Sequence, residues 1–552
     1  MRIGLIQLNA KIGDFEQNRS AIQKMAESIE ADLYVCPELC LSGYHARDLF
    51  VREEFLREEA RQLEILREWT AKSRKAIWVG HTLRTDERSG PALYNAASLF
   101  ADGVLLQRVR KRQLPNYNIF EERRYFRAAT EVPAKLNFRN VEMHTEICED
   151  SWQSVQTFGL DETFHYPTRA SSTTPGQIPQ VLVNLSASPF ESGKAQVRRD
   201  LLSGLARESH SFVVYVNYAG AQDELIFDGQ SSVYAPSGEV IFEAPAFSEG
   251  VFVVDLTEAP CAPAARNRWA DFHAATVSFI RDYARKTGFQ KVVLGLSGGI
   301  DSALCAALCA DALGSDNVLG VGLATRWTSR LSIDEAEILA RNLGIGYRAL
   351  NIETGLDSVT DLIGEDLAPL SQENIQSRLR GLVLMTLANN QNRLLISTAN
   401  KSEIAMGYST LYGDMCGALM PIGDLYKTEV YGLAHYLNQV AGRERIPTLT
   451  LSRAPSAELS PDQKDSDSLP EYPKLDAFLY MYLEHRERFV AERERWDKFL
   501  APYSCASLVR KMQLNEFKRI QAPLIARLHH RSFGKHWCQP VAKAIDLPGP
   551  AS

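Results

Sequence analysis

Residues 291–302 read KVVLGLSGGIDS, and the Ala- and Leu-rich stretch ALCAALCADAL (303–313) follows directly. The short apolar, β-branched run predicts a buried strand, and the stretch after it predicts a helix. Two glycines at the junction let the backbone approach an anion closely, and the helix start offers it free N–H groups. This strand–turn–helix segment therefore predicts a parallel α/β domain with a phosphate-binding turn.

The turn differs from two common phosphate motifs. It lacks the GK[ST] that ends a Walker A loop, and it lacks the G-x-G-x-x-G dinucleotide fingerprint. Asp301 would repel the phosphates unless a divalent cation lay between them. The alternative interpretation is a tight turn that needs glycine only for its geometry. The Asp and two Ser residues around the glycines favour the phosphate interpretation.

The second half of the chain alternates regularly between two kinds of segment. Helical periodicity covers 269–287, 302–313 and 332–343, and strand-like runs cover 291–296 and 317–323. This rhythm predicts βαβ units in a doubly wound parallel sheet.

The first half reads as short strands and hairpins separated by helices. Asp102-Gly103 and Ser237-Gly238 each stand between two strand-like runs, as hairpin turns do. Charge-rich amphipathic stretches at 51–73 and 192–208 suit exposed helices. The first half is therefore expected to be an α/β layered sandwich.

Composition limits the classes of function. The chain has 552 residues, 61 Lys+Arg and 68 Asp+Glu, for a net charge of −7, and 45% of its residues are hydrophobic. This acidic balance argues against a nucleic-acid or membrane partner. We expect a first domain over 1–256, a Pro- and Ala-rich linker over 257–268, and a second domain over 269–545.

Four ordered motifs give the second half a family resemblance. SGGIDS (297–302) resembles the pyrophosphate loop of ATP pyrophosphatases. With NIQSRLRG (374–381), STANKSEIAMGYSTLYGD (397–414) and PSAELSPDQKD (455–465), the segment resembles the synthetase domain of the NAD synthetase family. The resemblance implies Mg²⁺ as cofactor, with Asp301 and Glu403 as its ligands, and a loop carrying Gln463 and Asp465 that closes over the site. The ATP-binding residues that it implies are Ser297, Gly298, Gly299, Ser302 and Lys427.

One segment departs from this family's pattern. Residues 323–329 read LATRWTS, where the family usually has a proline and a tyrosine. Ala324 replaces the proline, and Trp327 keeps an aromatic face for stacking without the hydroxyl. Contacts to the adenosine side are therefore expected to differ from those of the family.

The first half carries a second set of reactive residues at predicted strand ends. Glu38 lies in CPELCLSGY, Lys111 in RKRQLPNY and Cys148 in EICEDSW. A thiol needs a base to become a thiolate, and a lysine could hold an oxyanion. Three such residues scattered over the chain are unremarkable by spacing alone.

The motifs around these residues are similar to those of the nitrilase, or carbon–nitrogen hydrolase, family, whose fold is an αββα sandwich. The resemblance extends over 1–256, and NYNIFEERRYF (116–126) is similar in particular to the glutaminase domain of glutamine-dependent members. It implies Cys148 as nucleophile, Glu38 as general base and Lys111 as stabiliser of the intermediate. It also implies that Glu122 supports the triad and that Tyr117 and Glu149 bind glutamine.

The remaining cysteines and histidines receive no role. The chain has nine cysteines, and the eight other than Cys148 are interpreted as small buried hydrophobic residues in a reducing cytoplasm. His529 and His530 are expected to be solvated in a basic, polar tail beyond residue 500. We expect a homo-oligomer, whose subunit number the sequence does not fix.

Together the two resemblances imply ATP-dependent amidation of nicotinate adenine dinucleotide to NAD⁺, with ammonia from glutamine, through an acyl-adenylate. Since ammonia is mostly protonated at neutral pH, an enclosed route between the sites is a further hypothesis. Two alternatives remain open. One is an amidotransferase of the same class that acts on another carboxylate or nucleotide, and the other is a non-catalytic scaffold derived from such an enzyme.

Overall fold

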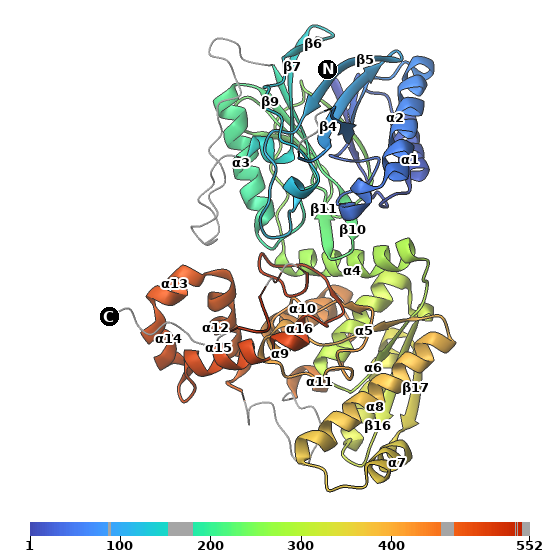
Figure 1. Cartoon of the computed structure of the whole chain (residues 1–552), viewed down its shortest axis with the longest axis vertical. Helices are drawn as coiled ribbons and strands as arrows, with labels where there is room; N and C mark the ends of the chain where they lie inside the picture. Colours follow the sequence, from blue (N-terminus) through green and yellow to red (C-terminus); the bar gives the residue numbers. More distant parts are fainter. Residues whose placement is uncertain (87–89, 153–179, 454–468, 536, 538, 544–552) are drawn as a thin grey trace. The chain divides into compact units, whose positions relative to one another are not determined.

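The computed structural model describes residues 1–86, 90–152, 180–453, 469–535, 537 and 539–543 (Figure 1). Two compact units make up the chain, the first ending at Arg266 and the second beginning at Asn267. No helix or strand occurs between β14 (Gly250–Asp255) and α4 (Arg268–Thr287). In the described part of the chain, none of the helices has both the length and the apolar character that a bilayer span requires.

Two six-stranded sheets form the centre of the first unit. The first contains, in spatial order, β14, β1 (Arg2–Gln7), β2 (Leu33–Val35), β3 (Ile77–Arg84), β4 (Leu93–Ala101) and β5 (Val104–Arg110). The second contains β13 (Val240–Glu243), β12 (Ser232–Tyr234), β9 (Phe212–Val216), β8 (Val181–Leu185), β7 (Val141–Ile147) and β6 (Leu136–Phe138). A separate hairpin joins β10 (Ala219–Gln222) and β11 (Leu225–Asp228).

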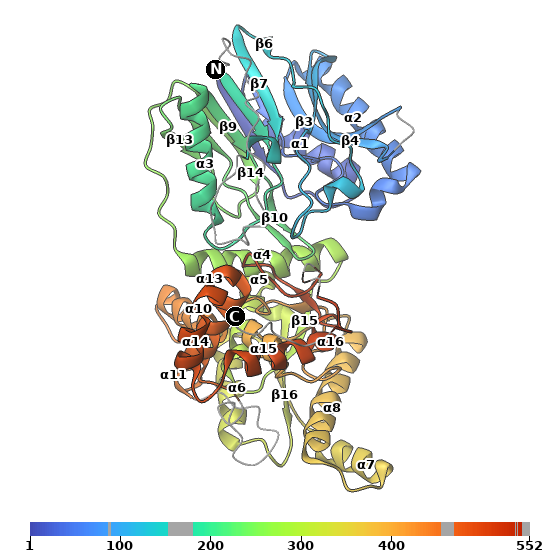
Figure 2. The same ribbon diagram turned by 60° about the vertical axis from the view of Figure 1, so that its left-hand side comes forward.

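Helices cover the outer faces of these two sheets, as both views of the first unit show (Figures 1 and 2). α1 (Phe15–Ser28) and α2 (Glu53–Ser73) pack on the first sheet, and α3 (Lys194–Ser209) packs on the second. Between the sheets, alternate side chains such as Leu5, Trp78 and Val183 form a buried apolar core. The predicted αββα sandwich is confirmed.

The two predicted hairpins of this unit are also confirmed. β4 and β5 pair antiparallel around Asp102 and Gly103, whose φ angles are +49° and +76°. β12 and β13 pair antiparallel as well, and Gly238 between them has φ +86°. The described residues of this unit also include three short 3₁₀ helices, η1 (Arg47–Val51), η2 (Glu122–Arg124) and η3 (Cys148–Ser151).

A six-stranded parallel sheet forms the centre of the second unit. Its spatial order is β17 (Gly346–Asn351), β16 (Val318–Ala324), β15 (Val292–Gly295), β18 (Leu394–Ile396), β19 (Leu419–Met420) and β20 (Leu524–Ile525). The chain thus starts at the centre, moves to one edge, and returns to build the other half. In such doubly wound sheets, ligands bind where the order reverses, outside the carboxyl ends of the central strands.

Helices pack around this sheet, so the predicted doubly wound domain is confirmed. α8 (Pro369–Asn390) packs Leu384 and Leu387 against Val293 and Leu395 of the sheet. The other helices are α5 (Ile300–Leu313), η4 (Ser315–Asn317), α6 (Arg330–Leu343), α7 (Glu353–Ile363), α9 (Lys401–Met406), α10 (Lys427–Ala441), α11 (Thr448–Ser452), α12 (Tyr472–Glu484), α13 (Arg486–Ala491), α14 (Arg493–Leu500), α15 (Cys505–Leu514) and α16 (Glu516–Arg519).

The prediction of a polar tail beyond residue 500 is wrong. β20 supplies the edge strand of the sheet, and His529 is buried against Glu429. The basic residues of this region also pack inside the unit. Arg519 is 1% exposed and donates to the carbonyl of Ala405 at 2.9 Å. This basic side chain therefore belongs to a buried hydrogen-bonding network and not to a solvated tail.

The eight cysteines that the structure describes are free thiols. Five besides Cys148 are buried, as expected for small apolar side chains. Cys261, in the segment that follows β14, is exposed and differs from that expectation.

Candidate active sites

Three predicted catalytic residues of the first unit come together at the ends of strands. Glu38 follows β2, Lys111 directly follows β5, and Cys148 opens η3 directly after β7. All three side chains are buried. β2 and β5 belong to one sheet and β7 to the other, so the fold brings both sheets to this site.

Lys111 lies between two buried carboxylates. Its Nζ donates to Oε1 of Glu38 at 2.6 Å and to Oε1 of Glu122 at 2.8 Å. Burial alone would lower the pKa of Lys111, but the charges of Glu122 and Glu38 outweigh it and raise that pKa well above its ordinary value. Lys111 is therefore a permanent cation that is ready to stabilise a developing negative charge.

Glu122, which the sequence resemblance expected to support the triad, contacts Lys111. Its Oε1 accepts hydrogen bonds from Lys111 and from the hydroxyl of Tyr44, the latter at 3.0 Å. Burial raises the pKa of Glu122 to about 8, with Lys111 opposing the shift and Glu38 assisting it. Burial and the cation of Lys111 thus act on the protonation of this carboxyl group in opposite directions.

The carboxylate of Glu38 is fixed from both sheets. Asn95 on β4 donates its side-chain amide to Oε1 at 2.6 Å, and the backbone N–H of Ala187 donates to Oε2 at 3.1 Å. Because each oxygen has a defined partner, the carboxylate is held in one orientation. Such a carboxylate can accept a proton at a fixed point.

Cys148 has an unusual backbone conformation for a residue other than glycine, with φ +47°. Asn184 on β8 donates to its carbonyl oxygen at 3.1 Å. Burial, followed by the charge of Glu38, raises the pKa of the Cys148 thiol far above its ordinary value. The sulfur is therefore a neutral thiol in the resting protein, and it would have to lose this proton to act as a nucleophile.

Tyr117 and Glu149, the predicted glutamine-binding residues, contact each other. The Tyr117 hydroxyl donates to Oε1 of Glu149 at 2.8 Å. Burial raises the pKa of Glu149, while Tyr117, Lys111 and Lys194 act in the opposite direction. Lys194, at the start of α3, also lies 6.0 Å from the centre of the Trp152 ring. A buried carboxylate and a lysine beside it suit a substrate that carries both an ammonium and a carboxylate group.

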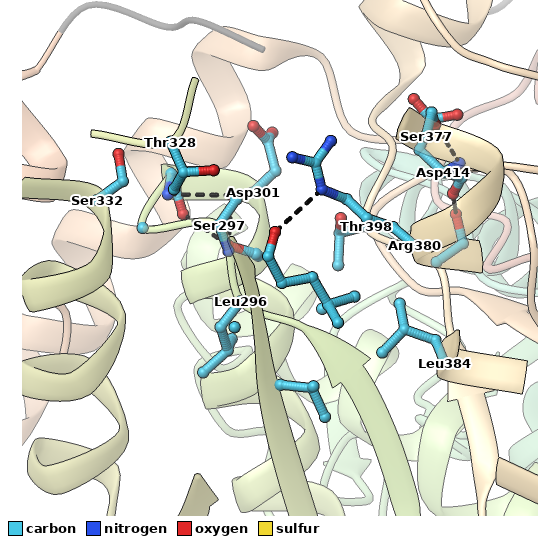
Figure 3. A pocket seen from close by; sticks show the side chains of 18 of the residues that line it. Leu296, Ser297, Asp301, Thr328, Ser332, Ser377, Arg380, Leu384, Thr398 and Asp414 are labelled. Carbon is cyan, nitrogen blue, oxygen red and sulfur yellow. Dashed lines mark hydrogen bonds between the residues drawn. The ribbon is translucent and has the colours of Figure 1, made fainter. Parts of the chain in front are cut away.

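The phosphate turn of the second unit follows β15 as predicted (Figure 3). The hydroxyls of Ser297 and Ser302 lie 3.1 Å apart, and the Gly299 N–H donates to the Ser297 hydroxyl at 3.2 Å. Gly298 has φ +77°, and a Cβ there would stand 2.4 Å from the carbonyl oxygen of Ser332. Only glycine fits this position, so the turn can present its backbone to an anion.

Lys427, Asp301 and Glu403 form one cluster beside this turn. Lys427 Nζ donates to Asp301 Oδ2 and, at 3.1 Å, to Glu403 Oε1. Asn400, the N-cap of α9, donates to Asp301 Oδ1 at 2.8 Å. The three residues that the sequence assigned to metal and phosphate thus lie together, although they come from α5, α9 and α10.

The cluster opens into a cavity of about 470 Å³ above the carboxyl ends of the central strands. The turn, the cluster and Ala324 line it, whereas Trp327 is not among its lining residues and is 40% exposed. Sequence reasoning missed two lining arginines. Arg380 on α8 donates from Nε to the Leu323 carbonyl at 3.2 Å (Figure 3), and Arg453 donates to the Ser332 hydroxyl at 2.6 Å. Arg380 lies within the recognised NIQSRLRG motif, which could have identified it.

The donor set of the cluster fits Mg²⁺. This ion is commonly held by one or two carboxylates together with substrate phosphates. Asp301 and Glu403 supply two carboxylates that share Lys427 as a neighbour. Within the described residues, no group of three or more His, Cys, Asp or Glu side chains forms a metal site of its own. Gln463 and Asp465 lie outside the described residues.

Missed residues of the first site are Tyr44, Asn95, Asn184 and Lys194. They are partners of Glu122, Glu38, Cys148 and Glu149, respectively. Tyr44 ends the recognised CPELCLSGY motif, which could have identified it, whereas Asn95 and Lys194 lie outside the motifs.

The comparisons with known proteins match both units. A carbon–nitrogen hydrolase family model matches residues 2–266, and an NAD synthase family model matches residues 272–522. The glutamine-dependent NAD(+) synthetase of Thermotoga maritima is 36% identical over 99% of both chains. That of Xanthomonas campestris pv. campestris is 38% identical over 98% of this chain and 97% of its own.

A solved structure supports the same assignment. The glutamine-dependent NAD+ synthetase from Acinetobacter baumannii, in complex with adenosine diphosphate, is 32% identical with a TM-score of 0.74 over 98% of each chain. The chain therefore belongs to the family of glutamine-dependent NAD(+) synthetases.

Proposed function

We propose that this chain hydrolyses glutamine in its first unit and uses the ammonia in its second unit to amidate nicotinate adenine dinucleotide to NAD⁺. The observation that carries the proposal is that one chain holds both sites, a Cys–Glu–Lys cluster and a phosphate turn with two carboxylates and a lysine. Neither site alone accounts for a glutamine-dependent ligase.

In the first unit, Cys148 Sγ attacks the side-chain amide carbon of glutamine while its proton passes to Glu38. Lys111 stabilises the oxyanion of the tetrahedral intermediate. The C–N bond then breaks, and ammonia leaves with the proton returned from Glu38. Water, deprotonated by Glu38, attacks the thioester, so glutamate and the free thiol are released.

Recognition of glutamine would use the residues beside the triad. Glu149 and Tyr117 suit the α-ammonium group, and Lys194 suits the α-carboxylate. This division keeps the ionic ends of the substrate apart from Lys111, which is reserved for the reacting carbonyl.

In the second unit, the turn formed by Ser297, Gly298, Gly299 and Ser302 would bind the ATP phosphates through backbone N–H and hydroxyl groups. The substrate carboxylate attacks the α-phosphorus and expels pyrophosphate. Ammonia then attacks the acyl carbon of the adenylate, which gives the amide and AMP. Lys427 would neutralise the negative charge that accumulates on the pyrophosphate as this group leaves.

Mg²⁺ fits this site, with Asp301 and Glu403 as its protein ligands. When bound, it would supply charge neutralisation on the phosphates and orient them. Lys427 would then serve as the phosphate partner next to the two carboxylates.

An assay of NAD⁺ formation with glutamine and, separately, with ammonium tests the division into two sites. Cys148→Ala should abolish the glutamine-dependent reaction and leave the ammonium-dependent reaction within about twofold, since the second unit is untouched. Continued use of glutamine by this variant would contradict the nucleophile assignment. ATP–pyrophosphate exchange that responds to other carboxylic acids but not to nicotinate adenine dinucleotide would instead favour the alternative amidotransferase.

We further propose a homo-oligomer, in which α8 lies against a second copy of the chain. Leu382 and Met385 are one helical turn apart and are 63% and 37% exposed on that helix. Leu382→Glu should shift the protein to a smaller species in light scattering after gel filtration. Val440→Glu, at an equally exposed apolar position on α10, is the control and should not.

A cytoplasmic location is proposed on chemical grounds. The described cysteines are unpaired, and Cys148 must remain a thiol to act, which a reducing compartment ensures.

A further inference from the structure

The site of the first unit depends on the distance between two sheets. Lys111 stands at the end of β5 in the first sheet, and Cys148 stands at the end of β7 in the second. No ladder of backbone hydrogen bonds joins β5 to β7, because they belong to different sheets. Apolar packing between sheets is not directional, so it does not by itself fix the position of one sheet's end relative to the other.

One side chain joins the two segments directly. Asp150, in η3 just after Cys148, is 5% exposed. Its Oδ1 accepts hydrogen bonds from the backbone N–H groups of Arg112 at 2.9 Å and Gln113 at 2.7 Å. Its Oδ2 accepts a bond from the N–H of Ile147 at 3.3 Å. The carboxylate thus binds the backbone directly after Lys111 and the backbone directly before Cys148.

These contacts are of the kind that fixes the position of one backbone segment relative to another. Backbone N–H groups cannot turn away as side chains can, so a carboxylate that accepts three of them has little freedom. Two of the donors are consecutive residues, which sets both the position and the direction of the segment that follows Lys111. The direct ion-pair partners of Lys111 are Glu38 and Glu122, whereas Asp150 interacts with Lys111 only through charge at longer range.

From these contacts we propose that Asp150 is a positioning residue, which holds Lys111 and Cys148 at the separation that oxyanion stabilisation requires. The proposal rests on the roles given above to Cys148 and Lys111. The neighbouring buried carboxylate does not share this role. Glu146 accepts from the Ser151 hydroxyl at 2.6 Å, lies 3.4 Å from Nε2 of His144, and approaches Arg112 at that residue's side chain, at 3.8 Å.

Asp150→Ala and Asp150→Asn test the proposal in the full chain. The alanine variant loses all three contacts, and its kcat for glutamate release should fall at least about a hundredfold, since small misplacements of catalytic groups cost this much. The asparagine variant keeps one oxygen for Arg112 and Gln113, so its kcat should recover to within about tenfold of the unchanged protein. KM for glutamine should stay within about threefold in both variants, because Tyr117 and Lys194 are unchanged.

Three controls make the result decisive. Ammonium-dependent NAD⁺ formation reports whether the second unit is intact, and KM for glutamine reports whether the first unit still folds around its substrate. Glu146→Gln, at a matched buried position, should leave kcat within about threefold. If Asp150→Ala unfolds the first unit, Asp150→Asn decides alone, since a three- to tenfold fall in kcat with KM unchanged supports the proposal and a kcat within threefold overturns it.

The proposal is overturned if Asp150→Asn and Asp150→Ala both keep kcat within threefold, or if KM rises while kcat is retained. It is also overturned if Glu146→Gln matches the loss. Failure of the proposed function would be recognised separately, as continued use of glutamine by Cys148→Ala.

Discussion

The two active sites differ in how far their charged side chains are exposed to solvent. In the first, Lys111, Glu38 and Glu122 are fully buried and pair with one another in the free protein. In the second, the side chains of Asp301 and Glu403 are 18% and 16% exposed on the wall of a cavity. One site is complete without its substrate, and the other has room for a large charged ligand.

The chemistry of the substrates accounts for this difference. The reacting group of glutamine is a neutral amide, so the protein must supply every charge that stabilises the transition state, and a buried cluster does so most strongly. ATP brings several negative charges of its own. The second site therefore needs side chains of both charges and an opening to solvent, because the bound ligand supplies the remaining negative charge.

The largest effect is expected at Asp301. Asp301→Asn removes a charge that the ligand complex needs, so NAD⁺ formation should fall about a thousandfold or more with either nitrogen source. Glutamate release, measured separately, should persist. Asp311→Asn, on the same helix but paired with Arg445 outside the cavity, is the control and should keep activity. Ammonium-dependent synthesis within tenfold of normal would show that the second site does not depend on this carboxylate.

Gly298→Ala should have the next largest effect, because it tests the shape of the second site without changing its charge. A Cβ would stand 2.4 Å from the Ser332 carbonyl oxygen, so the turn must shift. KM for ATP should rise by roughly thirtyfold or more. Gly288→Ala has a similar φ of +86° but meets nothing within 4 Å, so it should cost only about 1 kcal/mol of stability with no change in KM. If both variants raised KM equally, the cause would be backbone strain at a positive φ and not the clash of the new Cβ with Ser332.

A smaller effect, on pH dependence, should separate the two sites. The pKa of Glu122 is raised to about 8, so this group gains a negative charge as the pH rises through 8. That charge opposes formation of the oxyanion beside Lys111, and glutamate release should fall about tenfold between pH 7 and pH 9. Ammonium-dependent synthesis should rise over the same range, because more of the ammonium is deprotonated.

Glu122→Gln is the matching variant for this measurement. It stays neutral at every pH and should remove the alkaline fall in glutamate release. Parallel rises of the two reactions in the unchanged protein would contradict the role given to Glu122.

Sequence reasoning singled out the residues that the structure brings together in each site, because they lie in short motifs at strand ends. The strand–turn–helix at 291–313 also predicted the second sheet, since periodicity and glycine placement are local properties. The boundaries of β15 and α5 differ from the predicted ones by at most two residues.

What the sequence missed depends on contacts between distant segments. Asn95 and Ala187 hold Glu38, and they lie 57 and 149 residues from it. Arg519 and His529 are polar residues in an apparently polar stretch, and they are buried against distant partners, the Ala405 carbonyl and Glu429. Local patterns predict elements and motifs, whereas the partners that orient a catalytic group follow from the three-dimensional packing.

The smallest expected effect separates recognition from chemistry within the first site. Tyr117→Phe removes the 2.8 Å hydrogen bond to Glu149 and nothing from the triad. KM for glutamine should rise by about three- to tenfold, the value of one hydrogen bond of ordinary strength, with kcat unchanged. Tyr125→Phe loses an equal bond, to Asp48, away from Glu149 and should leave KM unchanged. A fall in kcat instead would mean that Tyr117 and Glu149 belong to the buried charge cluster, so that in this site binding and chemistry share the same electrostatic network.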